Sequence, residues 1–303
     1  MRDPLELFRF EQDTPPAALG APTLMVALGG FIDAGNAQRL LVSHLLASCE
    51  HTVVASFDVD QLIDYRGRRP VMTFDSDHFS AYADPSLLLY RLVDDEGTPF
   101  LLLTGPEPDY QWERVIEAVR HLVRVLGVER VVSAHGIPMA VPHTRPVGMT
   151  RYANDPDLIP GNAPVFGLVQ VPSSLETLLH YRLGEAGYDV IGFGVHVPHY
   201  LVQADFADGA VAALEAIRVS TGLKLSIGEL AALAEQTRMA IDAQIGESEE
   251  VGEVVRGLER QYDAFAEGRR RESLLATELA ELPSADEIGA EFEQFLRDAD
   301  DEA

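Results

Sequence analysis

A strand–helix–strand pattern that occurs twice along the chain is the feature that most constrains the fold. In its first instance, apolar residues 100–104 (FLLLT) precede an amphipathic helix predicted over residues 110–126, and residues 130–134 (RVVSA) follow as a second apolar run. Apolar residues recur at helical spacing along the middle segment. Two parallel strands need such a crossover, so the unit predicts neighbouring parallel strands with a helix on one face of the sheet.

The second instance comprises a strand predicted over residues 164–171, a helix over 173–186 and a strand over 189–197. Ser173 and Glu176 have the spacing of a capping box at the start of that helix. Between the two units, the proline-rich residues 136–161 show little periodicity, which is typical of a functional or covering loop.

Other segments extend the alternation. Further strands are predicted over residues 23–28, 52–57, 71–74 and 87–92. A helix is predicted over residues 33–48 with Asp33 as its N-cap. After about residue 221 the strands cease, and three helices are predicted over residues 226–245, 248–266 and 284–299. We therefore expect a three-layer α/β/α sandwich with a mostly parallel sheet in residues 1–220, and a helical subdomain and tail in residues 221–303.

Charge and cysteine content exclude several classes of protein. The net charge is −26, and residues 221–303 hold 21 acidic and 8 basic residues, so nucleic acid and anionic membrane surfaces are not expected partners. Cys49 is the only cysteine, which excludes an intrachain disulfide and a cysteine-based zinc site. The first residues lack a signal-peptide pattern, and no apolar run approaches the ~20 residues of a membrane span. We expect a cytoplasmic protein with no cofactor and no bound metal.

Glycines mark the first place where chemistry is expected. Gly29 and Gly30 end the first predicted strand, and Asp33 opens the following helix. This is the carboxyl edge of the predicted sheet, where ligands bind in open α/β folds. The spacing is neither that of a dinucleotide fingerprint nor that of a P-loop. The segment is either a tight turn with an N-cap or an anion site at a helix start.

Paired carboxylates follow the second strand. Asp58 and Asp60 share one side of an extended segment, and Tyr65 and Arg66 come shortly after them. Such a pair binds a metal or performs acid–base chemistry. The alternative is a pair of strand-end carboxylates that form ion pairs with nearby arginines.

Histidines follow two other predicted strands. His135 directly follows the strand predicted over residues 130–134, and His196 and His199 lie at the end of the last predicted strand. His143 and Arg145 lie in the proline-rich loop. A histidine cluster binds zinc or relays protons, whereas single strand-end histidines bond to loop backbone. The spacings match no metal motif, and no serine lies in a Gly-x-Ser-x-Gly elbow.

Taken in order, these segments resemble the actinobacterial branch of the proteasome assembly chaperone 2 family over about residues 20–220. The resemblance rests on residues 29–35 (GGFIDAG), 57–60 (FDVD), 62–70 (LIDYRGRRP), 103–109 (LTGPEPD), Trp112, 135–139 (HGIPM), 143–146 (HTRP) and 195–200 (VHVPHY). It implies a sandwich like that of nucleoside phosphorylases with an added helical domain, and a role in assembling the proteasome core. It supplies no catalytic residues.

Two functions remain open. The first is a non-enzymatic protein-binding or assembly-chaperone protein that forms homo-oligomers and has proteasome core subunits as partners. The chain ends Asp301-Glu302-Ala303, which departs from the hydrophobic-Tyr-any tripeptide of chaperones that dock on the proteasome. The second is an enzyme or sensor with a phosphorylase- or hydrolase-like fold and a small-molecule pocket at the carboxyl edge. That pocket requires the candidate side chains above to converge in one concavity.

Overall fold

The structure is a computed structural model that describes residues 3–30, 32–164, 166–247 and 249–280, with side chains up to residue 268. The chain forms two compact units, residues 1–249 and residues 250–303. Among the described helices, none combines the length and the apolar character needed to cross a membrane.

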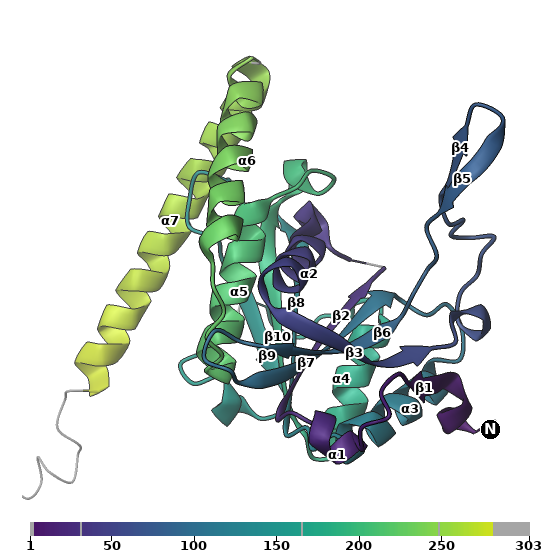
Figure 1. The fold of residues 1–303 in the computed structure, drawn as a ribbon. Helices are drawn as coiled ribbons and strands as arrows, with labels where there is room; N and C mark the ends of the chain where they lie inside the picture. The colour runs from purple at the N-terminus through teal and green to yellow at the C-terminus, as the bar shows by residue number, and fades with distance from the viewer. Residues whose placement is uncertain (1–2, 31, 165, 248, 281–303) are drawn as a thin grey trace, which may run out of the picture. The chain divides into compact units, whose positions relative to one another are not determined.

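A mixed eight-stranded sheet lies at the centre of the first unit (Figure 1). Its strands, in spatial order, are β1 (Phe8–Phe10), β3 (Glu50–Phe57), β6 (Leu88–Val93), β7 (Pro99–Pro106), β2 (Thr23–Gly29), β8 (Arg130–Met139), β10 (Asp189–Pro198) and β9 (Met149–Ala153). The central strands β7, β2, β8 and β10 are parallel, and the outer pairings are antiparallel. Five of the eight strands run in one direction, which confirms the predicted sheet.

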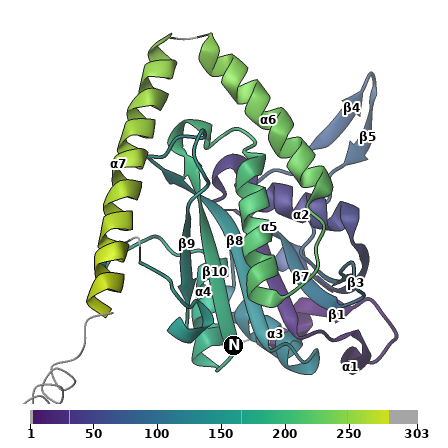
Figure 2. The ribbon, with the colours of Figure 1, turned by 90° about the vertical axis from the view of Figure 1, so that its left-hand side faces the viewer.

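Helices cover both faces of this sheet, as Figure 2 shows from the side. The helices of the first unit are α1 (Pro16–Leu19), α2 (Ala37–Ser48), α3 (Trp112–Val125), α4 (Leu175–Glu185), α5 (Ala207–Thr221) and α6 (Gly228–Gly246). The α3 and α4 helices pack on one face. The α2 and α5 helices pack on the other, with α6 against them. The three-layer α/β/α arrangement predicted from the sequence is confirmed.

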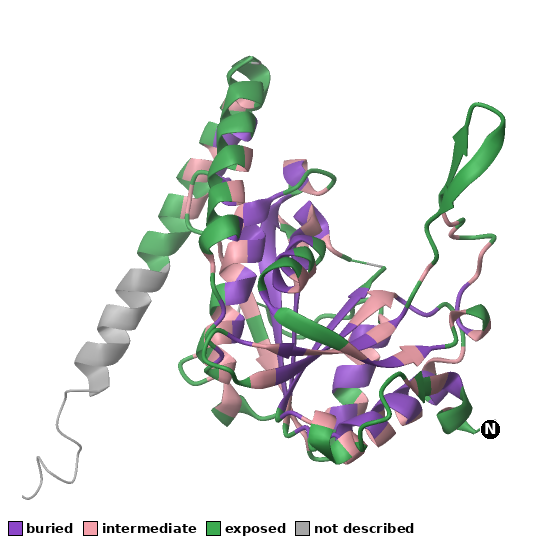
Figure 3. Ribbon diagram, in the orientation of Figure 1, coloured by how far each residue is buried: buried purple, intermediate pink, exposed green. Residues whose placement is uncertain are grey.

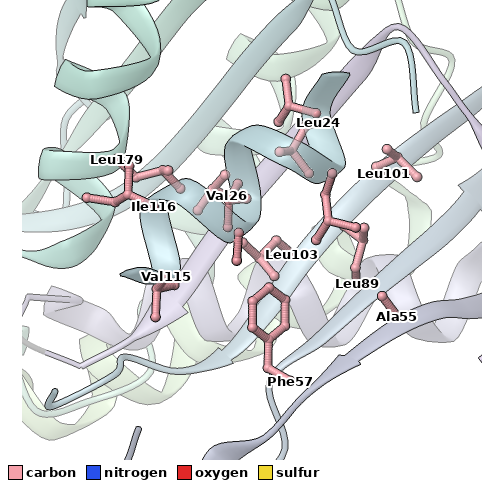
Figure 4. Close-up of a cluster of buried hydrophobic side chains, with 14 of the residues drawn as sticks. Leu24, Val26, Ala55, Phe57, Leu89, Leu101, Leu103, Val115, Ile116 and Leu179 are labelled. Atoms are coloured by element: carbon pink, nitrogen blue, oxygen red, sulfur yellow. The ribbon is translucent and has the colours of Figure 1, made fainter. Parts of the chain in front are cut away.

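The central strands are apolar on both sides because helices bury both faces. Leu24, Val26 and Leu28 of β2 pack toward α3 and α4, whereas the alternate residues Met25 and Ala27 pack toward α2 and α5. Figure 4 shows the first of these clusters, in which Leu101 and Leu103 of β7 and Val115 and Ile116 of α3 join β2. Buried residues accordingly concentrate between the layers in Figure 3.

The strand predicted over residues 164–171 is wrong. The described residues of this segment belong to no strand, and Phe166, Leu168, Val169 and Val171 are exposed. Both edges of β10 are occupied, one by β8 and the other by β9, so this segment cannot pair with β10 as the predicted strand–helix–strand unit requires. The sequence pattern missed β9 because it lies inside the proline-rich segment.

The predicted capping box is displaced by one residue. Ser174 is the N-cap of α4 and exchanges hydrogen bonds with Thr177, whereas Ser173 and Glu176 do not form the pair. The side chain of Glu176 is instead buried beneath the helix.

A hairpin stands apart from the main sheet. The strands β4 (Met72–Asp75) and β5 (His78–Tyr82) pair only with each other, and all their residues are exposed. Figure 1 shows the hairpin projecting from the first unit, and Figure 3 shows it without buried residues. The strand predicted over residues 71–74 therefore exists, but it does not pair with the main sheet.

The helices expected near the C-terminus agree with α6 and with α7 (Glu249–Ala280), which lies in the second unit. The helix predicted over residues 284–299 lies outside the described residues. The division into residues 1–220 and 221–303 stays a prediction. The sequence pattern missed α5, whose buried face consists largely of alanine and glycine and gives a weak apolar period.

Candidate functional site

The carboxyl edge of the sheet opens between its two central strands. Residues 23–26 of β2 pair with residues 130–133 of β8, and beyond these positions the strands separate. The freed backbone groups find side chains as partners. The N–H of Leu28 donates to Glu176 Oε2 at 3.2 Å, and the carbonyl of Ala134 accepts from Gln38 Nε2 at 3.1 Å.

Gln38 and Glu176 complete this bridge. They lie on α2 and α4, which cover opposite faces of the sheet, and Gln38 Nε2 donates to Glu176 Oε2 at 2.9 Å. Both side chains are buried. The pair thus replaces the missing ladder hydrogen bonds and joins the two helix layers through the sheet edge, which satisfies backbone groups that are costly to leave unpaired.

Asp33 holds the start of α2 against β8. Its carboxylate accepts hydrogen bonds from the N–H groups of Gln38 (2.8 Å), Arg39 (3.0 Å) and Gly136 (3.3 Å). The predicted N-cap position is wrong, because α2 begins at Ala37 with Asn36 as its N-cap residue. The Asp33 carboxylate nevertheless accepts the N–H groups of the first turn of α2. Burial raises the pKa of Asp33, and the backbone hydrogen bonds act in the opposite direction.

Two glycines allow this close packing. A Cβ on Gly136 would lie 1.9 Å from the carbonyl oxygen of Ala34, and a Cβ on Gly30 would lie 2.5 Å from Glu107 Oε2. Glu107 in turn accepts a hydrogen bond from the N–H of Leu175 at 2.6 Å and so fixes the start of α4. Both positions therefore require glycine for steric reasons.

Glu176 is charged although it is buried. Burial alone raises the pKa of Glu176, but the hydrogen bond and charge of His135, whose Nδ1 lies 3.4 Å away, outweigh it. The N–H of Leu28, which donates to Glu176 Oε2, acts in the same direction as His135. The pKa of Glu176 therefore stays below its usual value, and the carboxylate accepts the hydrogen bonds of the bridge.

A shallow groove of about 250 Å³ lies beside the bridge on the α2 side. Gly29, Asp33, Gln38 and Thr104 contribute to its wall. Each of the two most buried polar side chains in this wall, Asp33 and Gln38, has hydrogen-bonding partners within the chain. These two polar groups of the groove therefore stabilise the fold.

Four of the candidate residues lie at this central edge: Gly29, Gly30, Asp33 and His135. Asp58, Asp60, Tyr65 and Arg66 lie instead in the segment that follows β3, and none of them lines the groove. Asp58 accepts from Gln61 at 2.7 Å. Tyr65 donates to Asp60 at 2.6 Å, and this hydrogen bond is the main reason that the pKa of Tyr65 rises to about 12.

The other four candidates lie around the β8–β9 connection and the end of β10. His143 contacts the Tyr200 hydroxyl at 2.7 Å and Asp242 of α6 at 3.0 Å. His196 contacts Thr150 Oγ1 at 2.8 Å, and burial lowers its pKa. Two of these candidates, His143 and Arg145, line a different hollow, and His199 is exposed beside Tyr200.

The structure thus places the twelve candidates in three groups around the carboxyl ends of the strands. Within the part of the chain that the structure describes, no three His, Cys, Asp or Glu side chains are placed to hold a metal ion. The assignment of these residues to a binding site stays a prediction.

Sequence reasoning missed Gln38, Glu107, Glu176 and His180, which do most of the work at this edge. One signal was available, because Glu176 and His180 are four residues apart on the apolar face formed by Leu175, Leu179 and Leu183.

Comparison with known proteins places this arrangement in a family. The model of the PAC2 family matches residues 27–245. A search of curated proteins found no match.

Three solved structures are similar over most of the chain. A Mycobacterium tuberculosis protein of unknown function, Rv2714, is 47% identical, with a TM-score of 0.85 over 89% of this chain and 92% of its own. A Corynebacterium glutamicum protein of unknown function is 36% identical, with a TM-score of 0.81 over 86% and 97%. The Mycobacterium tuberculosis proteasome-assembly chaperone homologue Rv2125 is 23% identical, with a TM-score of 0.70 over 77% and 99%, and shares the fold.

Proposed function

Because this chain belongs to the PAC2 family, we propose that it is a non-enzymatic protein-binding protein with the role of an assembly chaperone. The family and the likeness to a proteasome-assembly chaperone homologue support a chaperone-like role. Proteasome core subunits are the partners that we propose, and the cytoplasm is the compartment.

The hairpin of β4 and β5 is the observation that carries this proposal. Met72, Phe74, Phe79 and Tyr82 lie on one of its faces, with 48 to 64% of each side chain exposed. The rings of Phe74 and Phe79 contact each other edge to face with centroids 5.2 Å apart. A lone two-stranded hairpin is marginally stable in water, so an apolar face of this kind is expected to pack against another protein surface.

We propose a second copy of this chain as the direct occupant of the hairpin face, because that face is nearly uncharged and so avoids the repulsion between two acidic chains. The chain carries a net charge of −26, so two copies repel each other unless they meet through neutral surfaces. The two strands carry one charged side chain, Asp75, at the turn, together with His78. We therefore propose a homo-oligomer that associates through this face and presents the assembled surface to proteasome subunits.

A second neutral segment supports protein binding. Nine of the eighteen large apolar side chains that are exposed in the described part of the chain fall in residues 71–82 and 166–171. Leu168 is fully exposed, and residues 163–174 contain no charged side chain. Such a concentration of apolar surface is typical of protein–protein contact sites.

The experiment is a pull-down of the tagged chain from cells of its source, with mass spectrometry of the proteins that co-elute. We expect proteasome α or β subunits to be enriched over an untagged control. The variant F74S/F79S should lose that enrichment, and the control T73A/A81S, on the opposite face of the same hairpin, should keep it. Absence of proteasome subunits from the wild-type eluate contradicts the proposed partner.

The groove beside Asp33 favours a second candidate function, a small-molecule enzyme or sensor. It lies at the carboxyl edge of the sheet, where open α/β folds bind ligands. Saturation-transfer NMR with nucleosides, each measured with and without inorganic phosphate as a co-ligand, tests this candidate, because the fold is expected to resemble nucleoside phosphorylases. Binding that T104A abolishes supports the candidate, and no transfer at any probe contradicts it.

A further inference from the structure

Three polar side chains meet on the sheet face that α4 covers. Ser133 of β8 and Tyr152 of β9 lie on either side of Gly192 of β10, because each is in register with that glycine. His180 lies on α4, one turn after Glu176, and its ring centroid is 6.2 Å from that of Tyr152. Side chains from three elements therefore converge beneath one helix.

Because Gly192 has no side chain, it leaves room for the Tyr152 ring above β10. A Cβ at this position would lie 2.0 Å from Cζ of Tyr152. The Tyr152 ring therefore lies across β10 and extends toward β8. Burial raises the pKa of the Tyr152 phenol, and the Ser133 hydroxyl acts in the opposite direction. Both residues are in register with Gly192, so their side chains lie on the same face of the sheet.

The hydrogen bonds at this place are incomplete. Within the described residues, six buried side-chain nitrogen and oxygen atoms have no hydrogen-bonding partner in the chain. Four of the six belong to this group: Ser133 Oγ, Tyr152 OH, and both ring nitrogens of His180. Buried polar groups in folded proteins are almost always satisfied by protein or ordered water. Four such atoms at one place indicate a common ligand.

The electrostatics select a neutral ligand. Burial lowers the pKa of His180 to about 4, so the ring is neutral at pH 7 and offers one donor and one acceptor. Burial and the charge of Glu176 raise the pKa of Tyr152, so its phenol stays protonated. The neighbouring Glu176 carboxylate is already engaged by His135, Gln38 and the N–H of Leu28. An ion of either sign would find no free counter-charge here.

We propose that α4 encloses an internal hydration site, in which one or more water molecules bridge the His180 ring to the hydroxyl groups of Ser133 and Tyr152. Ser133 is fully buried, which restricts the occupant to a small molecule. Water supplies both donors and acceptors, and buried waters typically make about three hydrogen bonds to otherwise unpaired groups. The site couples α4 to β8 and β9 through polar contacts, in addition to the apolar contacts of Leu179 and Leu183.

A high-resolution crystal structure of the full chain tests this proposal directly. We expect solvent density about 2.7 to 3.2 Å from a His180 ring nitrogen and from the Tyr152 or Ser133 hydroxyl. Direct hydrogen bonds among the three side chains, without solvent density between them, would overturn it. Magnetic relaxation dispersion of the solvent water gives another readout. The proposal is also overturned if the wild type holds no more long-lived internal water than the variant Y152F.

Thermal unfolding gives a second, independent test that needs no crystals. Removing a hydroxyl that bonds to internal water should lower Tm, so S133A and Y152F should both melt below the wild type. Removing a hydroxyl that has no partner should raise Tm, and that result in both variants contradicts the hydration site. The exposed serine Ser80 on β5 provides the control S80A, which should leave Tm unchanged.

Discussion

The β2–β8 opening and the β4–β5 hairpin are both departures from a regular sheet. At the opening the chain satisfies its own exposed groups, whereas at the hairpin it does not. At the opening, the side chains of Gln38 and Glu176 satisfy the freed backbone groups from within the chain. At the hairpin, the apolar face stays exposed, and the described residues of the chain supply no cover for it.

This difference indicates which of the two regions stabilises the fold and which is free to contact a partner. A polar group that is fully satisfied within the chain contributes to stability and specificity of folding. An apolar face that the chain leaves uncovered costs free energy unless a partner buries it. The opening therefore belongs to the fold, and the exposed face of the hairpin is the surface that we propose for recognition. Variants at the opening should change unfolding, and variants at the hairpin should change association.

The largest expected effect is at Glu176. The variant E176A leaves the Leu28 N–H, the Gln38 amide and His135 without their shared partner in a buried site. We expect the free energy of unfolding in urea to fall by about 3 to 5 kcal/mol. The control E176Q keeps one acceptor oxygen and should lose less. If E176A unfolds like the wild type, the bridge does not hold the sheet edge together.

Acidification should lower the free energy of unfolding by an amount comparable to that expected for E176A. The pKa of His180 is lowered to about 4, chiefly by burial, with Glu176 raising it and His135 lowering it. The unfolded state therefore binds a proton between about pH 6.5 and pH 4 that the folded state excludes, so stability falls as the pH falls through this window. The expected loss is about 3 kcal/mol.

The lowered pKa values of Glu176 and His196 act in the same direction. Urea unfolding of the wild type and of H180L at a series of pH values checks the assignment. H180L should show a shallower loss, and H78N, which changes an exposed histidine on the hairpin, should follow the wild type. Equal slopes in wild type and H180L would exclude His180 as the source.

A smaller effect is expected at Gly136. In G136A the new methyl group meets the backbone carbonyl of Ala34, so the segment between β2 and α2 must move away from β8. We expect a loss of about 2 kcal/mol in unfolding free energy. The matched control is G167A, where an added Cβ meets open space. A neutral G136A would show that the close contact relaxes without strain.

The smallest effect on folding is expected at the hairpin. F74S/F79S removes two exposed rings that contact each other, so the unfolding free energy of the monomer should change by about 0.5 kcal/mol or less. Urea unfolding at high dilution measures this quantity. A loss as large as that of E176A would mean that the hairpin belongs to the fold and not to recognition.

The sequence predicts the central sheet well because β2, β7, β8 and β10 are buried on both faces and read as apolar runs bounded by glycine and proline. It finds Asp33, which binds the first turn of α2, because that interaction is local, but it misplaces the N-cap, which is Asn36. It fails at residues 164–171, whose strand-like composition cannot pair with β10 because β8 and β9 occupy both edges of that strand. It also fails at Glu176 and Gln38, whose roles arise only when two distant helices meet at the opening.

Sedimentation equilibrium of the wild type and of F74S/F79S tests the central claim most directly. The account predicts a wild-type mass that is a multiple of 33.1 kDa, and a variant mass of 33.1 kDa at the same concentration. T73A/A81S should sediment like the wild type. A monomeric wild type, or a variant that keeps the mass of the wild type, would contradict the assignment of the hairpin to recognition.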